Sequence, residues 1–399
     1  MPTAVKPEMR ETSSLAHGRV IQSLKAEMRV LLLTDSNVFA GTERHILELA
    51  RGLQDRNIFV AIGCPADSPL VLMAAASGIE HVTIEKRGLL DVSAIVYLAK
   101  LLRRGDFDIV HAHNGRTALF AALACKLSSK GTVVATQHFL EPAHTTLRGL
   151  RAIISRAAHR WVQENTHHFI AVSRVAEELM LKRNSKLAPK MTRIPNGISI
   201  LNKAALSPVN EVRGSLHVPA SALLIVCVAR LEQEKNIADL VAAMKQVAAE
   251  EPNAVCLIAG QGSERSALEE QSKQLGLSKN VSLIGFHEDA LSLINACDLF
   301  VLPSRGEPFG LVLLEAMALE KAVIATAAGG PLEIVEDNET GFLTTPGDSA
   351  ALANAIVRLL HNPAARIRMG IQGRERFEKY FNAQSMSAAT LAVYRKVLK

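Results

Sequence analysis

LPSRGEPFGLVLLEAMALEKAVIATAAGGPLEIVEDNETGF, residues 302–342, is the stretch that decides the fold. The letters DLFVLP at 298–303 predict a short buried strand, and the apolar run at 311–318 predicts a helix. A tight loop that contains Glu307 joins the two. In an open parallel sheet, ligands bind outside the carboxyl ends of the strands, so this loop predicts a binding site.

The start of this helix suits an anionic ligand. Gly310 lets backbone approach a ligand closely, and the free N–H groups between Phe309 and Leu311 form an anion site that fits phosphate. Glu307 lies in the loop at the mouth, and Glu315 lies about two turns into the helix. Two carboxylates on either side of a phosphate site can accept hydrogen bonds from hydroxyl groups at both ends of a diphosphate.

The spacing of Glu307 and Glu315 resembles the E-x7-E signature of the retaining glycosyltransferases of family 4. The segment from Gly329 to Leu343 resembles the next block of that family, and the resemblance extends from Met28 to the C-terminus. It implies transfer of a sugar from a nucleotide-sugar donor to an acceptor hydroxyl, with retention of the anomeric configuration.

Short apolar strands alternate with helices along the chain, which predicts an α/β fold with two doubly wound parallel sheets. The resemblance implies that the two Rossmann-like domains face each other across a cleft, the GT-B arrangement. The expected segments are a flexible extension at 1–27, an N-terminal acceptor-side domain at 28–198, a linker at 199–220, a nucleotide-sugar-binding domain at 221–380 and a C-terminal helix at 381–399 that returns to the first domain.

Two cations follow the apolar run at 223–229. Arg230 and Lys235 lie at the expected carboxyl end of a strand, where an arginine fork and a lysine point charge can converge on a diphosphate. They also match the donor-phosphate element of family 4. The resemblance further implies that Gly41 faces the donor diphosphate, although Ala40 replaces the first glycine of that element, and that Phe286 borders the nucleotide base.

Histidines end two other expected strands. The string HAHN at 111–114 resembles the H-x-H element of the family, which implies an acceptor contact at His113, and His138 matches a histidine near the donor sugar. The resemblance thus implies His138 and Glu307 as the catalytic residues. His111 and His113 could also bind a metal ion with His138, but no carboxylate spacing supports such a site. We therefore expect neither a metal nor a cofactor, because the protein itself supplies the cations that hold the donor.

Composition limits the partners. The net charge of +6 fits anionic ligands, whereas 4% aromatic residues and the absence of a recognition motif disfavour nucleic acid. The five cysteines are scattered, as in a reducing compartment, and no apolar run reaches the ~18 residues of a membrane span. We expect a cytoplasmic protein whose basic faces near Arg103 and Arg148 allow peripheral contact with the inner face of an anionic membrane. The oligomeric state stays open.

The sequence thus favours a retaining glycosyltransferase of cell-envelope polysaccharide, lipopolysaccharide or glycolipid synthesis, with a sugar or lipid-linked acceptor. Two alternatives remain: a GT-B-like sugar-nucleotide epimerase, and a sugar-nucleotide-binding protein without activity. A nicotinamide-dependent enzyme is disfavoured because no G-x-G-x-x-G follows the strand that begins near Met28.

Overall fold

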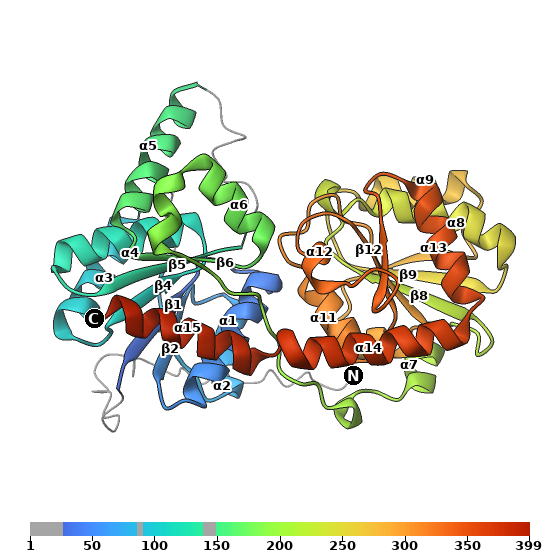
Figure 1. Ribbon diagram of the computed structural model, residues 1–399, viewed down its shortest axis with the longest axis horizontal. Coiled ribbons are helices and arrows are strands. Elements are labelled where there is room, and N and C mark those ends of the chain that lie inside the picture. The colour runs from blue at the N-terminus through green and yellow to red at the C-terminus, as the bar shows by residue number, and fades with distance from the viewer. Residues whose placement is uncertain (1–26, 86–90, 139–148) are drawn as a thin grey trace, which may run out of the picture.

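The chain forms two α/β domains that lie side by side, as the computed structural model shows (Figure 1). The structure describes residues 27–85, 91–138 and 149–399. The extension expected at 1–27 therefore lies outside the described residues, apart from Glu27.

The first domain is built on a seven-stranded sheet in which all paired strands are parallel. In spatial order the strands are β3 (Glu80–Thr83), β2 (Phe59–Cys64), β1 (Arg29–Leu33), β4 (Ile109–Ala112), β5 (Thr132–Gln137), β6 (His168–Ala171) and β7 (Met191–Arg193). Its helices are α1 (Gly41–Gln54), α2 (Pro69–Ala76), α3 (Val92–Arg104), α4 (Gly115–Ser128), α5 (Gly149–Asn165) and α6 (Arg174–Arg183). The strand order reverses between β1 and β4, the position at which doubly wound sheets bind ligands.

The second domain repeats this plan with a six-stranded parallel sheet. In spatial order the strands are β10 (Val281–Gly285), β9 (Ala254–Ala259), β8 (Leu223–Val228), β11 (Leu299–Leu302), β12 (Val323–Thr326) and β13 (Gly341–Thr344). The helices that follow β7 are α7 (Val209–Ser215), α8 (Ile237–Glu250), α9 (Arg265–Gln274), α10 (Ala290–Ala296), α11 (Leu311–Ala318), α12 (Pro331–Ile334), α13 (Ser349–Leu360), α14 (Pro363–Tyr380) and α15 (Ala383–Val397).

Each sheet has an apolar core on both faces, because successive side chains of a strand point to opposite sides. In β1, Val30 and Leu32 pack with α1 on one side, whereas Leu31 and Leu33 pack with α3 and α4 on the other. The continuous apolar runs of the sequence thus correspond to strands that helices cover on both faces.

The chain crosses between the domains twice, and the two crossings lie side by side. The amide of Ile198 donates to the Phe381 carbonyl at 3.1 Å, and the Ala383 amide donates back to the Ile198 carbonyl at 2.9 Å. A side chain at Gly197 would collide with the backbone of Asn382. Beyond this contact, α15 lies across the first domain (Figure 1), where Tyr394 is fully buried in the core that contains α1.

Some elements were absent from the expectations. Residues 199–220, expected as a linker, include α7, whose Val212 packs into the core of the second domain. The edge strand β3 and the helix α14 were not predicted. Three of the four side chains of β3 are exposed, and α14 is largely polar. Their apolar pattern is correspondingly weak.

Candidate active site

Two loops at the carboxyl edge of the second sheet bring Lys235 and Glu307 together. The first loop follows β8 and the second follows β11, and the Arg305 amide of the second donates to the Glu234 carbonyl of the first at 3.0 Å. Lys235 Nζ lies 2.6 Å from Glu307 Oε2, and both side chains are largely buried. The Ser304 hydroxyl donates to the same carboxylate oxygen at 3.3 Å. The site thus holds a paired cation and anion beside the start of α11.

The glycines of the 302–342 stretch shape this loop. Gly310 adopts a φ of +104° immediately before α11, a conformation that favours glycine. The Gly330 amide donates to the Glu307 carbonyl at 2.8 Å, and a Cβ atom at Gly329 would collide with that carbonyl. The segment after β12 therefore packs directly against the backbone of the Glu307 loop. This contact explains why the E-x7-E spacing and the later glycine pair occur in one motif.

Three other predicted donor residues lie in different environments. Arg230 is well exposed and forms an ion pair with Glu234 at 2.5 Å. Phe286 is 67% exposed beyond β10. The Phe309 side chain is buried and packs edge-on against Phe381, so Phe309 can contact a donor only through its backbone.

The first domain meets this site through the start of α1. A Cβ atom built at Gly41 would lie 3.8 Å from the Leu311 side chain, so the beginnings of α1 and α11 face each other across the two domains. Ala40 has a φ of −142°, which any residue adopts without strain. Burial raises the pKa of Glu315, an effect that Arg44 opposes and the carboxylate of Glu48 reinforces. Glu315 of the second domain therefore interacts electrostatically with charged side chains of α1.

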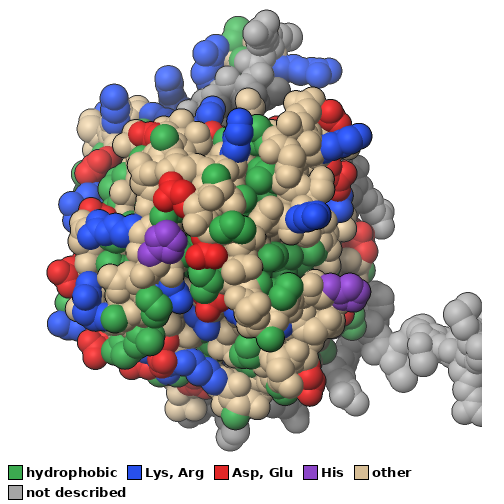
Figure 2. Space-filling view, turned by 90° about the vertical axis from the view of Figure 1, so that its right-hand side faces the viewer, with side chains coloured by type: hydrophobic (Ala, Val, Ile, Leu, Met, Phe, Trp, Pro, Cys, Tyr) green, Lys and Arg blue, Asp and Glu red, His purple; other side chains and the backbone are tan. Residues whose placement is uncertain are grey.

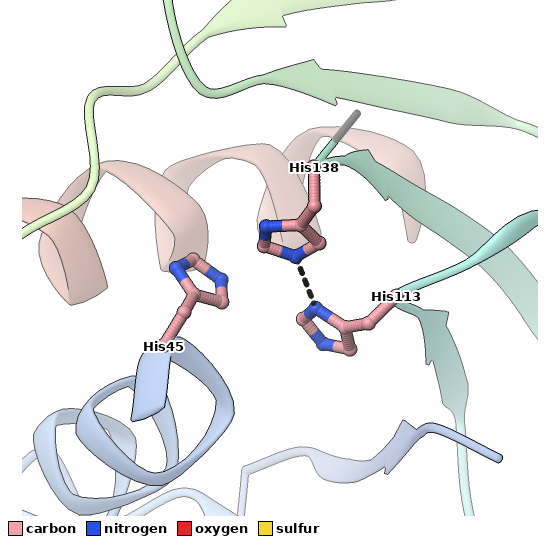
Figure 3. Close-up of side chains that lie close together, drawn as sticks. All are labelled: His45, His113 and His138. Atoms are coloured by element: carbon pink, nitrogen blue, oxygen red, sulfur yellow. Dashed lines mark hydrogen bonds between the residues drawn. The ribbon is translucent and has the colours of Figure 1, made fainter. Parts of the chain in front are cut away.

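His113 and His138 lie together at the carboxyl ends of β4 and β5. Nδ1 of His113 is 3.0 Å from Nε2 of His138, and His45 from α1 completes a group of three buried imidazoles (Figure 3). Burial lowers the pKa of His45 to about 4 and, with the neighbouring histidines, holds the pKa of His113 and His138 well below the usual value. All three rings are neutral at pH 7, so His138 can orient a hydroxyl group but does not carry a positive charge.

His111 packs against His113 but is not part of this group. Its Nδ1 lies 2.6 Å from the Tyr394 hydroxyl of α15, and its Nε2 lies 2.7 Å from the Thr136 hydroxyl. Both ring nitrogens are therefore used. The structure therefore does not place His111 with His113 and His138 as a possible ligand set, and the third histidine of the group is His45.

Comparison with known proteins identifies the chain. Residues 209–376 match the family described as Glycosyl transferases group 1, and residues 39–200 match Glycosyltransferase Family 4. A glycogen synthase from Mycobacterium tuberculosis is 31% identical over 292 residues, which cover 72% of this chain and 68% of that protein. The chain belongs to glycosyltransferase family 4. This glycosyltransferase is also 28% identical over 375 residues to a phosphatidyl-myo-inositol mannosyltransferase from Mycolicibacterium smegmatis, with 90% of the chain and 91% of the relative covered.

Solved structures show the same architecture. The structure of Anabaena HepE in complex with UDP and glucose matches the glycosyltransferase with a TM-score of 0.81 at 23% identity, covering 92% of this chain and all of that one. A sucrose-phosphate synthase from Thermosynechococcus elongatus matches with a TM-score of 0.75 at 24% identity over 93% of this chain and 99% of that one. Together with the two parallel sheets, these likenesses confirm the predicted GT-B fold.

Sequence reasoning missed two residues that contact the predicted histidines. Neither His45 nor Tyr394 was singled out from the sequence. A signal for His45 was present, because it directly follows Glu43 and Arg44 at the start of the helix that begins at Gly41. No local pattern connects Tyr394 to His111, since the two residues are 283 positions apart.

Proposed function

We propose that this glycosyltransferase moves a sugar from a nucleotide-sugar donor to an acceptor hydroxyl with retention of configuration. The observation that carries the proposal is the Lys235–Glu307 pair beside the start of α11. A cation, a carboxylate and the first amides of a helix lie at one sheet edge, where a diphosphate and the attached sugar can be held together.

Each group has a distinct role in this proposal. Lys235 and Arg230 neutralise the leaving diphosphate, and the amides at Gly310 and Leu311 donate to its oxygens. Lys235 exchanges its present partner for phosphate, which frees the Glu307 carboxylate to accept from sugar hydroxyls or to stabilise positive charge that develops on the ring. Glu315 accepts from the ribose hydroxyls.

The first domain supplies the acceptor side. His113 contacts the acceptor, and the neutral His138 orients the donor sugar at the reacting carbon. The departing phosphate oxygen takes the proton of the acceptor hydroxyl, so the reaction needs no protein base. Because Arg230 and Lys235 supply the positive charge, the transfer proceeds without a divalent metal.

The names of relatives support a role in envelope glycan synthesis. One relative is a lipopolysaccharide core biosynthesis glycosyltransferase from Rhizobium meliloti. Another is an Escherichia coli galactosyltransferase named for the acceptor α-D-GlcNAc-diphosphoundecaprenol, a lipid-linked sugar. The acceptor that we propose is accordingly a sugar or a lipid-linked sugar of a cell-envelope polysaccharide, lipopolysaccharide or glycolipid.

The deciding experiment screens a panel of sugar nucleotides for nucleoside-diphosphate release that depends on added acceptor, followed by NMR of the new glycosidic linkage. Acceptor-dependent release with retained anomeric configuration supports the proposal. Interconversion of the donor without an acceptor product would instead indicate an epimerase. Tight donor binding without turnover by any acceptor fraction would indicate a binding protein.

We also propose that α5 brings the enzyme to an anionic membrane surface on the cytoplasmic side. Figure 1 shows α5 projecting beyond the rest of the first domain. It carries exposed Ile153 and Ile154 together with three exposed arginines, at positions 151, 156 and 160, a combination that suits an anionic lipid interface. Arg148, which was expected in this basic face, lies outside the described residues. On the end face of the second domain, by contrast, acidic and basic side chains are interspersed (Figure 2). None of the described helices combines the length and the apolar character required to cross a bilayer.

A further inference from the structure

Three imidazoles from three separate elements converge inside the first domain. His45 belongs to α1, His113 follows β4 and His138 follows β5, and one ring nitrogen from each lies within 4.8 Å of the other two. The three residues are between 0% and 8% exposed. Figure 3 shows the rings grouped around a shared space, with the hydrogen bond between His113 and His138 at one side of it.

This group has more polar atoms than the described protein satisfies. Both ring nitrogens of His45 and Nε2 of His113 are buried without a well-aligned hydrogen bond in the described part of the chain, and the only polar side chain that acts on His45 as a hydrogen-bond partner is Asn196. Buried polar atoms are almost always paired in folded proteins, and a group left unpaired points to a ligand, an ion or an ordered water. Even with Asn196 paired to His45, one His45 nitrogen and His113 Nε2 remain, which indicates that something other than the protein binds there.

The donor set favours a transition-metal cation. Imidazole nitrogen binds zinc at about 2.0–2.1 Å, and three histidines with an open fourth position form a well-known zinc arrangement. Nδ1 of His113 and Nε2 of His138 are 3.0 Å apart in a hydrogen bond, which a cation shared by the two nitrogens replaces. One nitrogen of His45 lies within 4.8 Å of these two and completes the set.

A second layer of contacts holds the ligands in place. The His111 ring lies 4.3 Å from the His113 ring, centroid to centroid, and is itself fixed by Thr136 and by Tyr394 of α15. This packing limits the movement of the His113 ring.

We propose that His45, His113 and His138 bind a divalent transition-metal cation of the zinc class, and that the bound cation inhibits sugar transfer. The binding site goes beyond the proposed function, whereas the inhibition rests on it. A cation bound to His138 and His113 removes both from the sugar and the acceptor, so occupied enzyme loses the two contacts that the first domain supplies to the reaction.

The binding test uses the full chain without an affinity tag. Zinc is titrated against a chromophoric chelator, and Co²⁺ is added separately to follow the visible absorption of the bound ion, whose intensity reports the coordination number. We expect one equivalent of cation per chain with low-coordinate Co²⁺, and at least tenfold weaker binding in His45→Gln and His113→Gln. The matched control is His81→Gln, which alters an exposed histidine on β3 and should bind as the wild type does.

Circular dichroism establishes that each variant folds. No binding by the wild type, or unchanged binding in both folded cluster variants, would overturn the site. Loss of binding in His81→Gln would overturn it as well.

The activity test is separate. Zinc should lower the rate of acceptor-dependent nucleotide release in step with occupancy, EDTA should restore it, and His45→Gln should need at least tenfold more zinc for half-inhibition of its own rate. Bound zinc that leaves the rate unchanged would overturn the inhibition but not the site. Activity that disappears with EDTA and returns with zinc would overturn the inhibition and the metal-independent mechanism together. If no donor supports transfer, the proposed function fails while the binding result still decides the site.

Discussion

Lys235 Nζ lies 2.6 Å from Glu307 Oε2, although the two residues are 72 positions apart in the chain. Each residue follows a different strand of the second sheet, and parallel strands deliver their carboxyl ends to the same edge. We therefore expect the Lys235–Glu307 pair both to hold the two loops together and to bind the donor. Arg230 is exposed and does not join the two loops, so we expect it to act on donor binding alone.

Substitution of Lys235 and of Arg230 should separate the effect on donor binding from the effect on stability. Lys235→Ala and Arg230→Ala should each weaken donor binding by about 1.5–3 kcal/mol, roughly tenfold to a hundredfold, because each loses a charge-assisted contact to phosphate. Lys235→Ala should also lower the melting temperature, since Glu307 then lacks its partner, whereas the exposed Arg230 should be neutral for stability. Calorimetric donor titration and thermal unfolding measure both quantities, with the exposed Lys245→Ala as the control. Wild-type donor affinity in both variants would contradict the assignment.

The two glutamates should act on different parts of one donor. Glu315→Gln should weaken the affinity for donor and for free nucleoside diphosphate alike, because Glu315 faces the nucleoside end. Glu307→Gln should keep most of the nucleoside-diphosphate affinity while lowering turnover at saturating donor, because it removes the charge near the sugar. Calorimetry with nucleoside diphosphate and initial rates with donor distinguish the two. The opposite pattern would mean that the donor lies the other way round.

Membrane contact should depend on both charge and apolar side chains. The double variant Ile153→Glu/Ile154→Glu should lose binding to vesicles that contain anionic lipid, and the wild type should release from them at 1 M salt, where the Debye length is about 3 Å. Vesicle sedimentation measures the bound fraction. Leu72→Glu, at an exposed position on α2, is the matched control and should bind normally. Equal binding of the double variant, or no binding of the wild type at low salt, argues against a lipid-facing α5.

The stability should respond to the titration of His168. Burial, followed by the charges of Lys396 and Lys190, lowers the pKa of this residue to about 4, and its Nε2 lies 2.9 Å from the Thr192 hydroxyl. The His168 ring of the unfolded chain takes up a proton near pH 6.5, whereas the ring of the folded chain does not. The contribution of the neutral His168 to the free energy of unfolding is therefore complete above pH 6.5. It is lost as the pH falls from 6.5 toward 4, by about 1.4 kcal/mol per pH unit.

Urea unfolding at pH 7.5, 6 and 5 tests this point. His168→Gln should flatten the fall of the unfolding free energy relative to the wild type, because glutamine cannot take up the proton in either state. A wild-type slope in His168→Gln would contradict the lowered pKa.

The close approach of α1 and α15 should make Gly52 intolerant of a side chain. A Cβ atom there would lie 2.7 Å from Cβ of Ser387. Gly52→Ala should therefore destabilise the protein by about 1–3 kcal/mol, despite the higher helix propensity of alanine. Gly214→Ala on α7, where the space around the new methyl group is open, should instead be neutral or stabilising. Denaturant unfolding compares the two, and equal free energies in both variants would show that the α1–α15 contact adapts without cost.

The sequence predicted the parts of this structure that depend on local pattern. Apolar runs predicted the central strands, and the residues after them, such as Arg230, Glu307 and His138, were correctly expected at carboxyl strand ends. The partners of these residues could not be predicted, because the Lys235–Glu307 contact depends on how two loops pack. The burial of Phe309 could not be predicted either, because its position beside a helix start does not determine whether the side chain faces a ligand or the core.

The helix α15 sets the order in which the protein can be completed during synthesis. It packs into the core of the first domain with Tyr394 fully buried, but the ribosome makes the entire second domain between β7 and α15. At about 5–20 residues per second, the first domain waits roughly 10–40 s for the helix that covers α1. During that interval the apolar surface that later receives Met386, Leu391 and Tyr394 is open to chaperones and to aggregation on the nascent chain.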